Sequence, residues 1–332
     1  MASNRKRVAD ATLPRNFTVK PSHIAQKVKR PYAMLMNNPH FAFFGTPEFA
    51  AIILDELEQK GFIPTLVVTA PDKPKGRKLI VTPSEVKVWA TARNIPALTP
   101  TKLSDEDFLA ALTVADCNLF IVAAYGKIIP RGVLGIPEHG VLNVHPSLLP
   151  KFRGASPIES AILSNESHTG VTIMLLDEEM DHGPIVAQRQ YKGLTFAKVR
   201  PLQRSDLCCP PKGSVLTHDL AHFGGALLVE IIPEWMSGLK AVPQDHTQAT
   251  YTKKITKEDG LIDLADDPLK NYKKIRAYDN WPGAYFFIEH NEKKIRVHVT
   301  EAVYTEGKLT ITRVIPEGKK EMSYEDFLRG LH

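Results

Sequence analysis

An asparagine and a histidine two residues apart, Asn143 and His145, have residue types and a spacing that suggest chemistry. They stand at the end of an apolar run, residues 141–145, which Pro146 ends as it would end a β-strand. Side chains at i and i+2 of a strand leave the same face, so the amide and the imidazole would lie side by side. An amide N–H can stabilise an oxyanion while a neutral imidazole moves a proton, and acyl transfer requires both. By itself the pair is also compatible with a purely structural role.

A second polar segment follows the apolar run 170–176. Its acids are Asp177, Glu178, Glu179 and Asp181. Such a run is often a solvated turn, but Asp181 precedes His182-Gly183-Pro184, a turn sequence that can fix the direction of a carboxylate. We therefore predict that Asp181 lies beside His145 and orients it.

A zinc site is the alternative use of the same residue types. It would take its ligands from His139, His145, Asp181 and His182. Their spacing matches no common zinc site, and none of the three cysteines lies among them. We therefore expect no metal.

Strands that alternate with helices must position these residues. Strands are expected at 41–44, 65–69 and 119–124, and helices at 84–93 and 105–112, with a further helix that Thr46 caps and Pro47 opens. This alternation predicts an α/β fold with a Rossmann-like, doubly wound parallel sheet, in which ligands bind at the carboxyl ends of the strands. The first strand–helix turn holds a single glycine, Gly45, and no G-x-G-x-x-G pattern, so we expect no NAD.

The pattern divides the chain into three parts: a disordered basic extension (1–40), a catalytic domain (41–245) and a small C-terminal domain (246–332). The last part shows a strand-like run at 251–262, a helix at 268–278 and strand-like runs at 284–289, 294–304 and 308–315. Segment 192–213 has the composition of a surface insertion. The loop 71–82 is rich in Pro, Lys and Gly.

The net charge of +5 is weak support for nucleic-acid binding, because the extension 1–40 carries eight Lys/Arg and one acid. The remaining 292 residues thus have a net charge of −2, and any RNA contact must come from local patches. The sequence shows no apolar run that approaches the ~18 to 20 residues needed to span a bilayer. Three cysteines without framework spacing favour a reducing compartment. We expect a cytoplasmic protein of bacterial type, or an organellar one if 1–40 is a transit peptide.

A longer series of motifs along the chain indicates the class of protein. The run 143–150 and the turn 181–184 occur together with segments 44–50, 71–77, 152–158, 169–174, 249–251, 257–263, 275–278, 281–283 and 318–320. In this order they resemble the folate-dependent formyltransferase family, and within it the members that act on methionyl-tRNA. The resemblance covers nearly all of residues 41–330.

The resemblance implies 10-formyltetrahydrofolate as cosubstrate and initiator methionyl-tRNA as acceptor, for translation initiation. Its catalytic set would be Asn143, His145 and Asp181. Its folate-binding residues would be Ser147, Leu148, Leu149 and Pro150, with Asp177 and Gly183. Its tRNA-binding residues would be Arg77, Lys75 and Lys78 of the loop 71–82, with Lys293 and Arg296. The C-terminal domain would be an OB-like β-barrel, abbreviated here to three or four strands, and we expect a monomer.

Three other functions stay open at this stage. A sugar-nucleotide amine formyltransferase would use the same core with a small acceptor, and a hydrolase would pass the formyl group to water. A non-catalytic RNA-binding protein would have lost its chemistry, but Asn143, His145 and Asp181 are all present.

Overall fold

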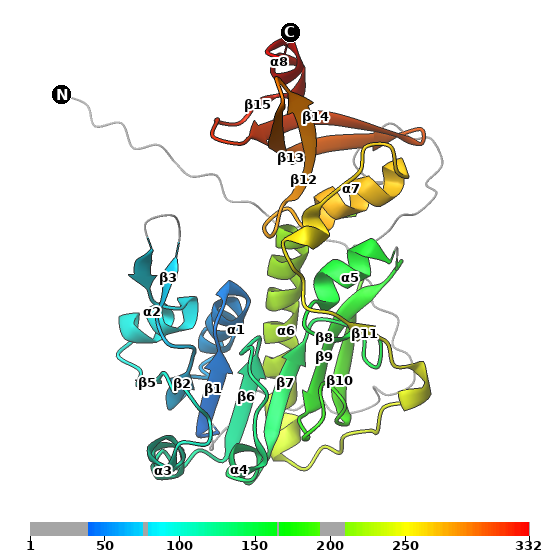
Figure 1. Cartoon of the computed structure of the whole chain (residues 1–332). Helices are drawn as coiled ribbons and strands as arrows, with labels where there is room; N and C mark the ends of the chain where they lie inside the picture. The colour runs from blue at the N-terminus through cyan, green and yellow to red at the C-terminus, as the bar shows by residue number, and fades with distance from the viewer. Residues whose placement is uncertain (1–38, 76–78, 165, 193–209, 332) are drawn as a thin grey trace, which may run out of the picture. The chain divides into compact units, whose positions relative to one another are not determined.

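A mixed seven-stranded sheet forms the framework of the computed structural model, which describes residues 39–75, 79–164, 166–192 and 210–331 (Figure 1). Its order is β10-β9-β7-β6-β1-β2-β5. The strands are β1 (Phe41–Gly45), β2 (Leu66–Val68), β5 (Ala97–Leu98), β6 (Leu119–Ala123), β7 (Val141–His145), β9 (Thr169–Leu175) and β10 (Ile185–Tyr191). The extension 1–38 and most of the segment 192–213 lie outside the described residues, so the expectations for them stay predictions.

The Rossmann-like arrangement is confirmed, with one difference in strand direction. β1, β2, β5, β6 and β7 are parallel, whereas β9 pairs antiparallel with both β7 and β10. The connection between β9 and β10, residues 176–184, can close a hairpin but is too short for a crossover to a parallel strand, which accounts for the antiparallel pairing of these two strands. This hairpin loop is the acidic segment that carries Asp181.

Helices cover both faces of the sheet, because its central strands are apolar on both sides. Phe41 and Phe43 of β1 join a core with α1 (Glu48–Glu58), α2 (Glu85–Ala92), α5 (Pro157–Leu163) and α6 (Gly213–Met236). Ala42 and Phe44 point into a second core with α3 (Glu106–Val114) and α4 (Arg131–Leu134). All five residues of β1 are buried, as expected of a central strand.

Helix α6 is the largest element that the residue pattern did not predict. By length and composition it is apolar enough to cross a membrane, but in the fold it packs along α1 and β9, and 56% of its most apolar 18-residue window is buried (Figure 1). A Cβ placed on Gly224 of α6 would lie 2.7 Å from Val144 Cγ1. The helix therefore approaches β7 closely, directly behind the strand that carries Asn143 and His145.

The start of α1 differs from the prediction. Pro47 is the N-cap residue and no side chain caps the helix, because the Thr46 hydroxyl donates instead to the carbonyl oxygen of Tyr125 at 3.2 Å. This bond ties the turn after β1 to the segment after β6. The expected helix 84–93 is confirmed, with the Ser84 side chain accepting from the backbone N–H of Lys87.

The C-terminal residues form a four-stranded antiparallel sheet, as expected for an abbreviated β-rich domain. Its strands are β12 (Ala284–His290), β13 (Lys293–Thr305), β14 (Lys308–Pro316) and β15 (Met322–Ser323), and its helices are α7 (Pro268–Ala277) and α8 (Tyr324–Arg329). Their apolar side chains form a third core.

Two segments take a different structure from the one expected. Most of 251–262 is not strand: β11 (Tyr251–Thr252) pairs with β8 (Arg153–Gly154), and a 3-10 helix follows at Glu258–Gly260. The presumed loop 71–82 contains a hairpin, β3 (Lys73–Lys75) and β4 (Ile80–Thr82).

Candidate active site

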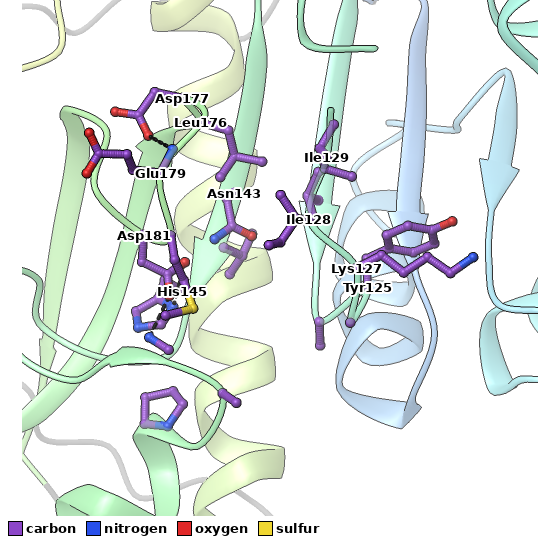
Figure 2. Close-up of a pocket in the computed structure, with 18 of the residues that line it drawn as sticks. Tyr125, Lys127, Ile128, Ile129, Asn143, His145, Leu176, Asp177, Glu179 and Asp181 are labelled. Carbon is purple, nitrogen blue, oxygen red and sulfur yellow. Dashed lines mark hydrogen bonds and ion pairs between the residues drawn. The ribbon is translucent and has the colours of Figure 1, made fainter. Parts of the chain in front are cut away.

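The three residues predicted to act together are brought together at one cavity of about 480 Å³ (Figure 2). Asn143 and His145 project from the carboxyl end of β7, and Asp181 reaches them from the loop between β9 and β10. They are largely buried: Asn143 is 8% exposed and His145 4% exposed. The cavity thus lies where a doubly wound sheet is expected to bind ligands, at the ends of its parallel strands.

His145 is held by contacts at both ring nitrogens. Its Nε2 lies 2.9 Å from the carbonyl oxygen of Phe152, which can only accept, so Nε2 carries a hydrogen. Its Nδ1 lies 3.7 Å from Asp181 Oδ1, too far for a hydrogen bond but close enough for an ion pair once Nδ1 is protonated. Nδ1 is therefore the atom that is available to accept a proton.

The Asn143 side chain makes no hydrogen bond within the described ranges. Its polar atoms are not among the fully buried atoms that lack a partner, so they open into the cavity. The side chain lines the cavity beside His145 (Figure 2). Its N–H donors are consequently available to a bound oxygen.

Asp181 occupies a strained position that its surroundings impose. Its backbone lies in the left-handed region, with φ of 52°, which is uncommon for a residue other than glycine. Its Oδ2 accepts from the backbone N–H of Gly154 at 2.7 Å. Two residues later, a Cβ on Gly183 would lie 2.0 Å from the Leu175 carbonyl oxygen, so only glycine allows this close return of the chain to β9.

The predicted folate-binding residues are only partly at the cavity. Asp177 lines it, whereas Ser147, Leu148, Leu149, Pro150 and Gly183 do not. Ser147 is completely buried and its hydroxyl donates to the Lys151 carbonyl oxygen at 2.7 Å. The Leu149 N–H donates to Thr172 Oγ1 at 3.1 Å, which attaches this turn to β9. These contacts show that the 147–150 turn supports the end of β7. Direct folate binding by this turn stays a prediction.

The opposite wall of the cavity was not predicted. The segment 124–129 follows β6 and faces Asn143 across the cavity, with Ile128 pointing toward it (Figure 2). Two left-handed residues, Ala124 at φ 46° and Gly126 at φ 81°, turn this segment away from the strand direction. Burial raises the pKa of Tyr125 to about 12, so its hydroxyl is protonated at neutral pH. Because β6 is parallel to β7, the rule on strand ends would have indicated this segment.

The alternative of a zinc site receives no support from the geometry. The described part of the chain contains no group of three or more His, Cys, Asp or Glu side chains arranged to hold a metal ion. His182, one of the four candidate ligands, bonds instead to Asp177 Oδ2 through Nδ1 at 2.7 Å and stacks on His246 with ring centroids 4.1 Å apart.

The predicted tRNA-binding residues are only partly visible. Arg77 and Lys78 lie outside the described residues, and Lys75 is placed on β3 without a description of its side chain. Lys293 and Arg296 both lie on β13, but their odd spacing puts them on opposite faces of the strand.

The face of β13 that carries Arg296 is aromatic as well as basic. Arg296 lies 5.8 Å from the ring centroid of Tyr285, and Lys294 lies 4.5 Å from that of Phe287, which is 41% exposed. Tyr285 and Phe287 pack edge to face. Interleaved cations and aromatic rings are typical of surfaces that bind nucleic acids. The charge pattern of the sequence indicates the cations of this face but not its rings.

Comparison with known proteins identifies the family. A model described as Formyl transferase matches residues 39–196, and one described as Formyl transferase, C-terminal domain, matches residues 254–308. The methionyl-tRNA formyltransferase of Chloroflexus aggregans is 39% identical over 312 residues, which cover 87% of this chain and 96% of the relative. The chain belongs to the formyl transferase family, whose enzymes use formyl-tetrahydrofolate, and the expected resemblance is confirmed.

Solved structures share the fold at low sequence identity. Methionyl-tRNA formyltransferase from Clostridium thermocellum has a TM-score of 0.53 at 15% identity and covers 86% of this chain and 99% of its own. HypX from Aquifex aeolicus in complex with tetrahydrofolic acid has a TM-score of 0.57 at 16% identity and covers 88% of this chain and 47% of its own.

Proposed function

We propose that this chain transfers the formyl group of 10-formyltetrahydrofolate to the α-amino group of initiator methionyl-tRNA. The observation that carries the proposal is the Asn143 carboxamide, which lines the cavity beside His145 and makes no hydrogen bond within the described residues. Family membership and curated relatives named methionyl-tRNA formyltransferase support the donor and the acceptor.

Each of the three residues has a part in the proposed step. The acceptor amine attacks the formyl carbon, and Asn143 donates an N–H to the oxygen on which negative charge develops. His145 Nδ1 takes the proton that the amine loses, and the Asp181 carboxylate 3.7 Å away stabilises the resulting imidazolium. The bond from the formyl carbon to N10 of the folate then breaks, and N10 receives the proton from His145.

The cavity fits a cosubstrate with a flat, partly polar ring system. Its volume of about 480 Å³ lies within the range usual for small-molecule sites. Apolar walls come from Val122, Ile129 and Leu176, and polar groups come from Asn143 and Asp177. We propose that the walls enclose the pterin and that Asp177, rather than the 147–150 turn, makes the polar contact to it.

For the acceptor, we propose that the aromatic and basic face of β12 and β13 binds tRNA. Lys294 and Arg296 would neutralise phosphates, while Tyr285 and Phe287 offer rings to unpaired bases. Lys293 would contribute less, since it lies on the other face. The basic loop with Lys75, Arg77 and Lys78 is proposed to contact the acceptor stem, and the enzyme is proposed to work as a cytoplasmic monomer.

The test is formyl transfer by the purified chain with 10-formyltetrahydrofolate and one of three acceptors: charged initiator tRNA, an amino sugar nucleotide, or water alone. Transfer to the tRNA is expected, and Asn143→Ala should lower kcat by about 10²-fold or more, as loss of one oxyanion donor does. Asn118→Ala is the matched control, because Asn118 lies just before β6, at the opposite end of that strand from the cavity, and its Oδ1 also lacks a partner within the described residues.

The outcomes separate the alternatives. Transfer only to the sugar amine, or formate release with water alone, would refute the tRNA acceptor while keeping the catalytic set. Equal activity of the Asn143→Ala and Asn118→Ala variants would refute the role of Asn143.

A further inference from the structure

Arg153 is a buried cation that the proposed mechanism does not use. It is 1% exposed, and no carboxylate pairs with it among the residues that the structure describes. Its guanidinium donates to Gln244 Oε1 from Nη2 at 2.7 Å and from Nε at 3.2 Å, and to His246 Nδ1 at 2.8 Å. A buried charge with neutral partners is expensive, so stability alone does not account for it.

The arginine determines how the neighbouring amide is oriented. Gln244 is 5% exposed, and Arg153 occupies its Oε1 with two donors, so its Nε2 must point the other way. That nitrogen donates to the carbonyl oxygens of Asp181 at 3.0 Å and of Gly183 at 2.7 Å. One amide therefore holds the strained backbone on both sides of residue 182.

The same arginine supports Asp181 by two further routes. The next residue, Gly154, donates its backbone N–H to Asp181 Oδ2 at 2.7 Å. His246, which Arg153 also contacts, stacks on His182 with the two rings 6° from parallel. The side chain and the backbone of the Asp181 turn are thus both fixed by groups that Arg153 organises.

We infer that Arg153 and Gln244 are positioning residues that hold the Asp181 carboxylate toward His145. Neither lines the cavity, so they act through Asp181 and not on substrate. The inference rests on the proposed function, in which Asp181 stabilises protonated His145.

Replacing the glutamine at position 244 with glutamate tests directly whether this residue positions Asp181. Gln244→Glu would give Arg153 a carboxylate partner, and charge-assisted bonds are stronger than neutral ones. It would also remove both donors to the Asp181 and Gly183 carbonyls and set a carboxylate against them. A residue that serves only stability should tolerate this change, whereas a positioning residue should not.

The experiment compares Gln244→Glu with Gln190→Glu, in which an exposed glutamine of β10 undergoes the same change of charge. Formyl transfer, thermal unfolding and hydrogen–deuterium exchange of the segment 177–183 are measured on the full chain. For Gln244→Glu we expect an unfolding midpoint no lower than that of the unchanged chain, faster exchange in 177–183, and kcat reduced about 10- to 100-fold. The KM for folate should stay within about twofold. Gln190→Glu should resemble the unchanged chain in all four quantities.

Three results would overturn the inference: wild-type kcat in Gln244→Glu, a loss of kcat matched by Gln190→Glu, or unchanged exchange in 177–183. If Gln244→Glu does not fold, Gln244→Met, which removes the same donors without a charge, is held to the same criteria. Absence of formyl transfer by the unchanged chain would refute the proposed function instead, and the exchange measurement would still decide the positioning role.

Discussion

Replacing Asp181 with asparagine tests the catalytic geometry with little change in shape. The oxygen of the new amide can still accept from the Gly154 N–H, the bond that now measures 2.7 Å to Oδ2. What changes is the group that faces His145 Nδ1, 3.7 Å away: a carboxylate oxygen becomes an N–H donor. The variant therefore keeps the support of the loop and removes the negative charge.

The size of the effect follows from that distance. Two unit charges 3.7 Å apart interact by about 4.5 kcal/mol at an effective dielectric constant of about 20. This is an upper bound on the stabilisation of the imidazolium, since the Asp181 side chain is 14% exposed. It corresponds to at most about 10³-fold in rate, because about 1.4 kcal/mol is tenfold. We expect Asp181→Asn to lower kcat by about 10²- to 10³-fold.

The assay is steady-state formyl transfer at saturating tRNA, with folate varied. The KM for folate should change little, because Asp181 acts on the proton transfer and not on binding. Glu138→Gln, which changes an exposed acid before β7 and outside the cavity lining, is the control for loss of one negative charge. A kcat within threefold of wild type for Asp181→Asn, or an equal loss in the control, would refute the role assigned to this carboxylate.

Three further outcomes are expected. Gly224→Ala should lower the free energy of unfolding by about 1 to 3 kcal/mol in chemical denaturation, because its Cβ would meet Val144 Cγ1 at 2.7 Å; an unchanged midpoint would mean that α6 can move away from β7. The hydrogen bond from Arg93 lowers the pKa of Glu58, so this carboxylate stabilises the fold above its unfolded pKa of about 4.5, and the contribution disappears as pH falls through the folded value. Glu58→Gln should thus destabilise the chain by roughly 0.5 kcal/mol at pH 7 and not at pH about 2, and an equal loss at both would exclude the ion pair as the cause. Arg296→Ala should weaken tRNA binding and its salt dependence more than Lys293→Ala does, and the reverse order would place the tRNA on the other face of β13.

The positions of the proposed catalytic residues could be predicted because local rules determine where their side chains point. Two residues on one strand share a face whatever the rest of the fold does, so Asn143 and His145 needed only a strand that ends at Pro146. The loop of Asp181 follows a second buried strand of the same sheet, as predicted. Because β9 is antiparallel to β7, its carboxyl end lies beside Leu142, so the loop must return along β7 to bring Asp181 to His145, and the pattern missed this strand direction.

The supporting contacts could not be predicted, since they join residues distant in sequence. Arg153 and Gln244 are 91 residues apart, and each is unremarkable among its neighbours. Their meeting depends on the two-residue pairing of β8 with β11, which is too short to leave a periodic signal. Helix α6 was missed for a different reason: it is apolar on most of its surface, so it lacks the amphipathic pattern by which helices are recognised.

The difference between local and long-range contacts also explains how the strained turn at Asp181 persists. A left-handed aspartate followed by a glycine pressed against β9 costs free energy, and a hairpin loop alone would relax it. Here the loop is held by the Gly154 N–H on its carboxylate, by the Gln244 amide on two of its carbonyls, and by the His246 ring on its imidazole. Gly154 belongs to β8, and Gln244 and His246 lie on the segment that leads into β11. The position of the proposed catalytic carboxylate thus depends less on its own loop than on the short pairing of β8 with β11, two strands that are 98 residues apart in sequence.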